Sequence, residues 1–204
     1  MMMSLTGGEV ITEINVNWAV IQLTVPILIE GCDPVNNPFE ALISKIRGSK
    51  TSVDGNVHIK NEKYQFTFYF SNESITDTKE KLKSFELPGD YVSFLSHYES
   101  ATLFKSAKHN SGGYDVLSTE LVIGYWKGYS IDHPYYPIVW SDISNSCICV
   151  DQDRIHSGKG YLTWVGSILP DDTIDIDLTF TELLEQLIEH DGIEFWDRPI
   201  EEEK

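Results

Sequence analysis

Three short runs rich in β-branched and aromatic residues stand close together between Tyr135 and Val165, and they constrain the fold more than any other feature. They read YYPIVW, CICVD and YLTWV, and clusters of Ser, Asn, Asp and Gly separate them. Runs of this composition between turn residues are typical of antiparallel strands. The sequence therefore predicts a meander of antiparallel strands joined by tight turns.

Helix signals stand on both sides of these strands. Upstream, Leu87–Tyr98 carries apolar residues at helical spacing on one stripe. Downstream, Thr179 and Glu182 form a predicted capping box for a helix that runs to His190. Helices and a mostly antiparallel sheet in this order predict an α+β fold, with the helices packed on the sheet.

The first 80 residues predict a strand, a helix and a hairpin. Residues 9–29 have strand-like composition, and Asn37 followed by Pro38 marks the start of a helix. Residues 49–56 are predicted to be a loop, and residues 57–70 a hairpin. This N-terminal α/β extension is either a small separate subdomain or a set of strands that extends the same sheet.

Three cysteines, Cys32, Cys147 and Cys149, are an odd number without a secretory signal, which favours free thiols. Cys147 and Cys149 are two apart on a predicted strand, so we expect both to face the same side and to be buried. The apolar run Ala19–Ile29 is too short to cross a bilayer and lacks signal-peptide flanks. The expected location is the cytoplasm, without membrane attachment.

The formal net charge of −17 is concentrated in the second part of the chain. Residues 86–204 hold 22 Asp or Glu against 7 Lys or Arg, whereas residues 1–85 hold 10 against 8. This charge argues against a nucleic-acid partner, because phosphates would be repelled. It suits either a basic protein partner or simply a solvated acidic surface.

No constellation for catalysis or metal binding stands out in the sequence. The six histidines are scattered without a metal-ligand spacing, and Asp171, Asp172, Asp175 and Asp177 lack the EF-hand pattern. No nucleophile motif is present, and SGKG joins two predicted strands instead of opening a helix. We expect no cofactor, no metal and no enzymatic activity; a hydrolase would require a deep polar pocket.

Aromatic residues gather just before and within the predicted meander. The set comprises Tyr125, Trp126, Tyr129, Tyr135, Tyr136 and Trp140. Aromatic side chains with a polar rim are typical of protein-binding hot spots, although such residues can equally fill a core. The predicted partner-binding residues are Trp126, Tyr129, Tyr135, Tyr136, Asp142, Asp151 and Asp153.

The order of these signals resembles the SUKH superfamily, which groups Smi/Knr-type cell-wall regulators with bacterial immunity proteins. Its opening helix motif is matched by Leu87, Pro88, Asp90, Tyr91, Phe94 and Leu95. Its strands are matched by PIVWSDISNSCICVD and SGKGYLTWV, with Asp142 and Asp151, and its closing helix by Phe180, Leu183, Leu184 and Leu187. The resemblance places a SUKH-like domain at residues 81–192, followed by an acidic tail at 193–204.

The resemblance implies helices packed on a bent sheet and a non-enzymatic binding role. The first hypothesis is an immunity protein that binds and occludes a toxin, such as a basic nuclease domain. The second is a regulatory or scaffold protein of the Smi/Knr type with a cellular partner. The third is a hydrolase or small-ligand enzyme. The sequence leaves the partner and the oligomeric state open.

Overall fold

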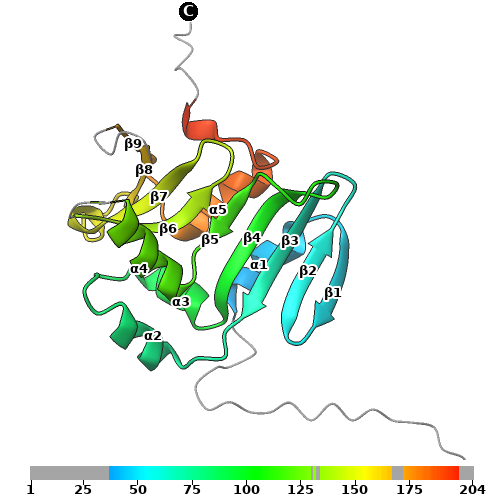
Figure 1. Ribbon diagram of the computed structural model, residues 1–204, viewed down its shortest axis with the longest axis horizontal. Coiled ribbons are helices and arrows are strands. Elements are labelled where there is room, and N and C mark those ends of the chain that lie inside the picture. Colours follow the sequence, from blue (N-terminus) through cyan, green and yellow to red (C-terminus); the bar gives the residue numbers. More distant parts are fainter. Residues whose placement is uncertain (1–36, 130, 132–133, 167–171, 198–204) are drawn as a thin grey trace, which may run out of the picture. The chain divides into compact units, whose positions relative to one another are not determined.

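The computed structural model describes residues 37–129, 131, 134–166 and 172–197, which belong to one compact unit. Within these ranges nine strands form one antiparallel sheet in sequential order, with five helices packed on it (Figure 1). The predicted α+β class is confirmed. The predicted strand at 9–29, Cys32 and the end of the tail lie outside the described residues.

The elements follow the chain in the order of their labels. The helices are α1 (Pro38–Lys45), α2 (Ile75–Lys81), α3 (Gly89–Leu95), α4 (Thr119–Gly128) and α5 (Phe180–Glu189). The strands are β1 (Ser49–Val53), β2 (Asn56–Lys60), β3 (Tyr64–Phe70), β4 (Tyr98–Ser106), β5 (Tyr114–Val116), β6 (Tyr135–Ser141), β7 (Ser146–Asp151), β8 (Leu162–Gly166) and β9 (Thr173–Asp175). Two short 3-10 turns are η1 (Gln152–Arg154) and η2 (Phe195–Asp197).

The predicted antiparallel strands are confirmed as β6, β7 and β8. The tight turns are confirmed only between β6 and β7, because residues 152–161, which include η1, connect β7 to β8. The β6–β7 connection is a tight turn in which Asn145 takes a left-handed backbone conformation, with φ of 50°. Asn tolerates this region better than most residues, so the turn forms without glycine. Neighbouring strands of the meander pair antiparallel, with a register shift between Pro137 and Val139 in the β6–β7 pair.

The predicted loop at 49–56 is wrong, because β1 occupies most of it. All five residues of β1 are exposed, so neither face of the strand requires apolar residues. Its sequence, SKTSV, accordingly lacks the alternation of apolar and polar residues that marks a half-buried strand. Asp54 and Gly55 both have positive φ, which suits the two-residue hairpin turn that joins β1 to β2. Pairing with β2, and not burial, makes this segment a strand.

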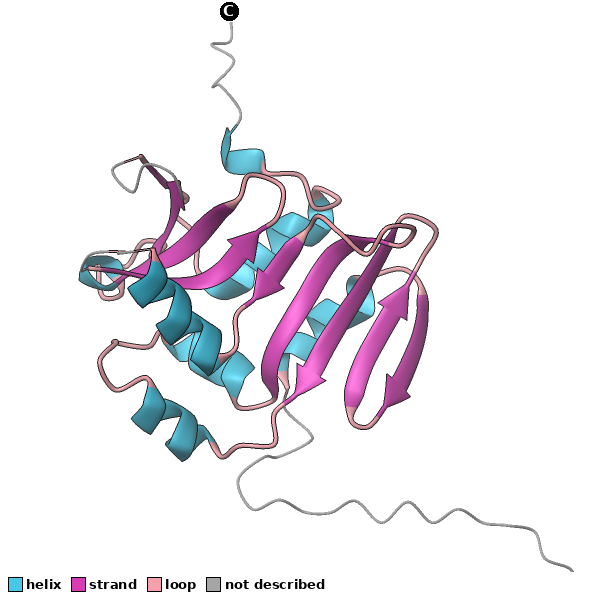
Figure 2. Cartoon of the chain, viewed as in Figure 1, coloured by secondary structure: helices cyan, strands magenta, loops and turns pink. Residues whose placement is uncertain are grey.

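The strands of the N-terminal extension belong to the same sheet as the meander. β3 pairs with β4 along most of its length, from Tyr64 opposite Ser106 to Phe70 opposite Tyr98. The boundary predicted near residue 80 falls between these two paired strands, in the segment that contains α2 and α3. Residues 49–70 are therefore strands of one continuous sheet (Figure 2).

The main core lies between one face of the sheet and helices α1, α3 and α5. Its centre is aromatic: Phe94 of α3 lies 5.4 Å from Phe39 of α1 and 5.2 Å from Phe180 of α5, both edge to face. All three rings are almost completely buried. Burying each one stabilises the fold by roughly 2–3 kcal/mol. We call this side of the sheet the core face.

Hydrogen bonds at helix starts follow the sequence signals. Asn37 caps α1, and Thr179 and Glu182 form the predicted capping box of α5. Asp90 accepts hydrogen bonds from the Thr181 backbone N–H and the Tyr161 hydroxyl, and so joins α3 to the start of α5 and to the residue that precedes β8. The capped helices are fixed in position by these contacts as well as by packing.

Helix α4 lies between β5 and β6 in the chain. Ser118 accepts a hydrogen bond from the Leu121 N–H and caps the helix. In Figure 1, α4 lies in front of the strands, whereas α1 and α5 lie behind them. The part of the tail that is described packs on the sheet, with the ring of Trp196 in η2 6.4 Å from that of Tyr114.

Candidate functional site

The side of the sheet opposite the core face carries the candidate site, and we call it the α4 face. One residue from every strand lies in a single row across it: Thr51, His58, Thr67, Thr102, Asp115, Trp140, Cys147, Val165 and Thr173. The row is polar over β1–β5 and becomes apolar over β6–β8. Helix α4 packs against β6 at this change of character.

A small second core lies under α4. Ile131, Cys147, Cys149 and Val165 are buried there. The prediction that both thiols are buried on the same side is confirmed. Burial raises the pKa of Cys149 well above its ordinary value, so that thiol stays protonated and poorly nucleophilic at neutral pH.

Three rings at the edge of this core form what we call the aromatic cluster: Tyr125, Tyr129 and Trp140. Tyr125 and Tyr129 are four apart on and just after α4, which places them on one side of the helix. Tyr129 stacks on Trp140 of β6 with 5.6 Å between ring centroids, and Tyr125 lies 5.3 Å from both. Tyr129 remains 41% exposed, so the cluster is open to solvent on that side.

A bulge in β4 brings a lysine to the α4 face beside the cluster. Phe104 has φ of 56°, a conformation that is strained for a bulky residue, and the β3–β4 register shifts at this point. Leu103 and Phe104 are both buried among the core residues, so the alternation of side chains between the two faces of the sheet is delayed by one residue. Lys105 is thereby turned to the opposite face.

Lys105 joins two carboxylates in what we call the ion cluster: Lys105, Asp115 and Asp142. Its buried ammonium group lies 3.0 Å from the Asp115 carboxylate and 2.7 Å from that of Asp142. The Trp140 indole N–H donates to Asp142 over 2.9 Å, which couples the ion cluster to the aromatic cluster. Burial raises the pKa of Asp115, and the Lys105 ammonium opposes that rise.

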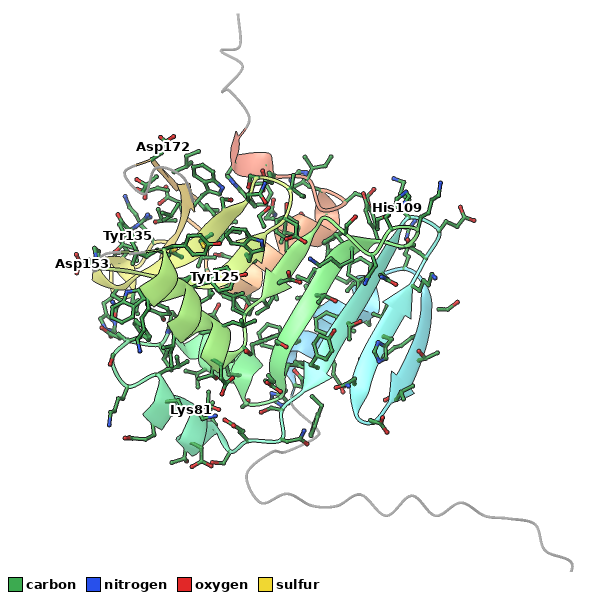
Figure 3. The ribbon with its side chains drawn as sticks, in the orientation of Figure 1. Lys81, His109, Tyr125, Tyr135, Asp153 and Asp172 are labelled. Carbon is green, nitrogen blue, oxygen red and sulfur yellow. The ribbon has the colours of Figure 1, made fainter. Side chains whose placement is uncertain are left out.

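A second group of charges lies at the β7–β9 end of the α4 face. Arg154 of η1 forms ion pairs with Asp175, at 3.0 Å, and with Asp177. Asp153 is exposed beside them, and Tyr135 is half-buried opposite Asp151 in the β6–β7 pairing. Burial raises the pKa of Tyr135, and the neighbouring Asp151 raises it further. Figure 3 labels Tyr135 and Asp153 at this end.

Tyr136, one of the predicted partner-binding residues, is not accessible at the surface of this structure. Its side chain is completely buried on the core face, and its hydroxyl donates to the Glu86 carbonyl over 2.8 Å. Consecutive residues of a strand point to opposite sides, so Tyr135 and Tyr136 cannot share one face. The hydrogen bond to the Glu86 carbonyl satisfies the buried Tyr136 hydroxyl.

The other predicted site residues differ in how accessible they are. Tyr129, Asp142 and Asp153 are exposed, and Tyr135 is half-buried. Trp126 is half-buried and packs edge to face on Phe85 at 5.2 Å, which makes it part of the contact between α4 and the core. Asp151 is buried, and its carboxylate accepts the Asp153 backbone N–H at the start of η1.

Sequence reasoning missed Lys105 and Asp115. Nothing in the run YESATLFKS marks the bulge, because Phe104 is an ordinary strand residue by composition. Gly113 carries the available signal. A Cβ there would lie 2.2 Å from the Leu103 carbonyl oxygen, so only glycine allows the backbone to pass close to the bulge.

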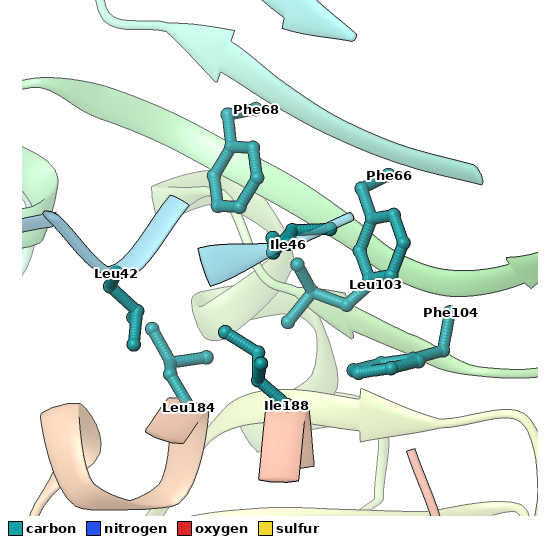
Figure 4. A pocket seen from close by; sticks show the side chains of 8 residues that line it. All are labelled: Leu42, Ile46, Phe66, Phe68, Leu103, Phe104, Leu184 and Ile188. Carbon is teal, nitrogen blue, oxygen red and sulfur yellow. The ribbon is translucent and has the colours of Figure 1, made fainter. Parts of the chain in front are cut away.

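A separate hollow lies between α1, α5 and the strands β3 and β4 on the core face. Figure 4 shows its inner part, lined by Leu42, Ile46, Phe66, Phe68, Leu103, Phe104, Leu184 and Ile188. The inner volume of about 10 Å³ is at the lower limit for holding one water molecule, and its lining offers no hydrogen bond. An outer hollow of about 440 Å³ shares four of these residues and adds Lys45, Arg47, Asn61, Glu189 and Asp191.

Within the described residues no group of three or more His, Cys, Asp or Glu side chains is arranged to hold a metal ion. The helices among these residues are all too short or too polar to cross a membrane. Comparison of the chain with protein-family models, with curated proteins and with solved structures finds no match.

Proposed function

We propose that this protein is a non-enzymatic binding protein of the SUKH immunity type, which neutralises a toxin by covering its active site. One observation carries the proposal. Partly or fully exposed aromatic rings and carboxylates lie on the α4 face: Tyr129 stacks on Trp140, which donates to Asp142, and Tyr135 lies opposite Asp151, two residues before the exposed Asp153. Exposed aromatic side chains surrounded by charge are typical of binding hot spots.

The electrostatics of this face favour a basic partner. Carboxylates gather on it and at its rim: Asp115, Asp142, Asp151, Asp153, Asp172, Asp175 and Asp177. Lys105 and Arg154 are each paired with two carboxylates, so their charge is already compensated locally. A surface of one sign attracts an oppositely charged partner and accelerates encounter, which is useful when a toxin must be stopped quickly.

The positions of α3 and α5 that carry the SUKH resemblance have structural roles. Tyr91, Phe94 and Leu95 are buried under the sheet, and the apolar residues of α5 pack against them. Asp90 joins the two helices by its hydrogen bonds. These residues therefore support the scaffold, and the proposed binding surface is formed by α4, β6, η1 and residues 172–177.

A co-expression experiment tests the function. The toxin encoded by a neighbouring reading frame is expressed with and without this protein, and growth is scored. We expect wild-type protein to restore growth and to bind the purified toxin domain. A regulatory protein of the Smi/Knr type would leave growth unrestored and would bind a cellular protein instead, which would contradict the proposal.

Charge reversal locates the binding face. The double variant Asp153→Lys, Asp172→Lys reverses two exposed carboxylates at the β7–β9 end of the α4 face. We expect the association rate to fall by roughly tenfold or more at low salt, because attraction becomes repulsion. Glu62→Lys, at an exposed position in the β2–β3 turn, is the control and should change the rate much less. Equal effects of the two changes, or an association rate indifferent to salt, would place the binding face elsewhere.

A further inference from the structure

The aromatic cluster and the ion cluster together form a small surface with a definite chemistry. The Tyr129 ring is 41% exposed and lies nearly parallel to the Trp140 indole, with 18° between the planes. The Asp142 carboxylate, whose side chain is 36% exposed, is held beside that indole by the Trp140 N–H. A ligand that reached Tyr129 would therefore meet aromatic faces and a fixed carboxylate at once.

The charge of this surface is negative although it contains a lysine. Asp115 and Asp142 bear two formal negative charges against one positive charge on Lys105. A carboxylate accepts about four hydrogen bonds, and Lys105 donates one to each. The remaining lone pairs and the net charge of the ion cluster are suited to a second cation that approaches from solvent.

We propose that the surface formed by Tyr129, Trp140 and Asp142 binds the guanidinium group of an arginine side chain on the protein partner. The inference rests on the proposed function and names the feature of the partner that the α4 face recognises. A guanidinium group is planar, so it stacks on aromatic rings and donates in the same plane to a carboxylate. A lysine ammonium lacks that flat shape and is more strongly hydrated.

The bulge in β4 contributes to this recognition by placing Lys105. The buried ammonium fixes Asp115 and Asp142 at distances of 3.0 and 2.7 Å, so neither carboxylate has to be ordered when the ligand arrives. Binding groups held in position before association cost less entropy than mobile ones. Lys105 is a positioning residue in this scheme and does not contact the arginine.

A titration of the whole protein with N-acetyl-arginine amide tests the inference without requiring the partner. The readout is the NMR resonance of the Trp140 indole N–H, assigned by its disappearance in Trp140→Phe. We expect a saturable shift with a dissociation constant on the order of 1–10 mM, as befits one stacked ion pair. N-acetyl-citrulline amide, which has a similar shape without the charge, should give no saturable shift.

Variants locate the binding site. Tyr129→Ala removes an exposed ring, and Asp142→Asn removes the charge while retaining an acceptor for the Trp140 N–H. Each should weaken binding at least roughly fivefold, the equivalent of one stacking or charged contact. The matched control is Tyr69→Ala in β3, an equally exposed tyrosine at 37%, which should leave binding unchanged. Dispersed amide spectra verify that each variant is folded.

Two outcomes of the titration would overturn the inference: a shift of the Trp140 resonance that never saturates, or equal binding of the arginine and citrulline amides. The second outcome would identify a site for neutral planar ligands instead. Failure of the proposed function has a different signature, in which the arginine amide binds as expected but the protein restores no growth beside the toxin. Conversely, a toxin bound equally well by wild type and by Tyr129→Ala would refute the arginine anchor alone.

Discussion

Asp151 lies at the end of β7, where its side chain is mostly buried and caps the short turn that follows. Burial raises its pKa above the ordinary value of 3.8, and the hydrogen bond from the Asp153 N–H opposes this rise. A carboxyl group of this kind favours the folded state only while it is protonated. Its contribution is complete below the unfolded pKa and is lost as the pH rises through the folded pKa.

The variant Asp151→Asn tests whether the raised pKa of Asp151 makes the stability of the fold depend on pH. The amide retains an acceptor for the Asp153 N–H and cannot ionise. We therefore expect the variant to gain stability relative to wild type as the pH rises from 3.5 to 7, because wild type loses the contribution of the protonated carboxyl. Urea denaturation across this pH range measures the difference. Parallel stability curves for the two proteins would show that Asp151 does not titrate abnormally.

At the scale of elements, the bulge in β4 connects the core to the α4 face. Phe104 takes its strained conformation, and strain of this kind costs about 1–3 kcal/mol. Packing offsets the cost: the Phe104 ring lies 4.8 Å from Phe66 and 5.4 Å from Tyr64. The same bulge turns Lys105 toward Asp115 and Asp142, so a core residue determines the geometry of the site.

Two adjacent glycines allow a matched test of this element. Gly112 and Gly113 have almost the same φ, 73° and 74°, so alanine pays a similar backbone penalty at both. Beside Gly112 a Cβ would meet nothing within 4 Å, whereas beside Gly113 it would collide with the backbone of Leu103 and Phe104. We expect Gly112→Ala to cost about 1–2 kcal/mol of unfolding free energy and Gly113→Ala at least twice as much.

Chemical denaturation measures both values, and the Trp140 indole resonance reports on the site. Gly113→Ala should shift that resonance, because displacement of the bulge moves Lys105 and with it the carboxylate that accepts the Trp140 N–H. Gly112→Ala should leave it in place. If the two alanine variants lost the same unfolding free energy, the close approach of Gly113 to the bulge would not contribute to stability.

At the scale of the whole molecule, one continuous sheet predicts one unfolding transition for the described residues. Ile59 of β2 is 2% exposed and belongs to the main core, yet it lies in the part of the chain that the sequence allows to be a separate subdomain. If the sheet unfolds as a unit, Ile59→Ala destabilises residues far along the chain as well. Large-to-small changes of this kind cost about 2–5 kcal/mol.

Tryptophan fluorescence provides the distant probe, since Trp126, Trp140, Trp164 and Trp196 all lie beyond β4. The measurement is made in a Trp18→Phe background, so that only these four residues report. We expect Ile59→Ala to lower the denaturation midpoint of the fluorescence signal by the full cost of the substitution. An unchanged midpoint would mean that β1–β3 unfold independently of the rest.

Local signals determined the elements that the sequence could predict. The capping residues Asn37 and Thr179 and the turn-bounded runs of the meander depend on neighbours in the chain, so α1, α5 and β6–β8 were predictable. The polar strand β1 was not, because its hydrogen bonds with β2 replace the pattern that burial would have imposed. The α+β class followed from the order of these local signals.

The tertiary structure alone decided which side chains share a face. Composition grouped Tyr135 with Tyr136, but strand alternation sends Tyr136 into the core. Lys105 reaches the α4 face through the bulge in β4. Packing around Phe104 and the close approach of Gly113 produce this bulge, and neither is visible in the local sequence of the strand. Sequence thus determined which elements form, and long-range packing determined which residues meet at the site.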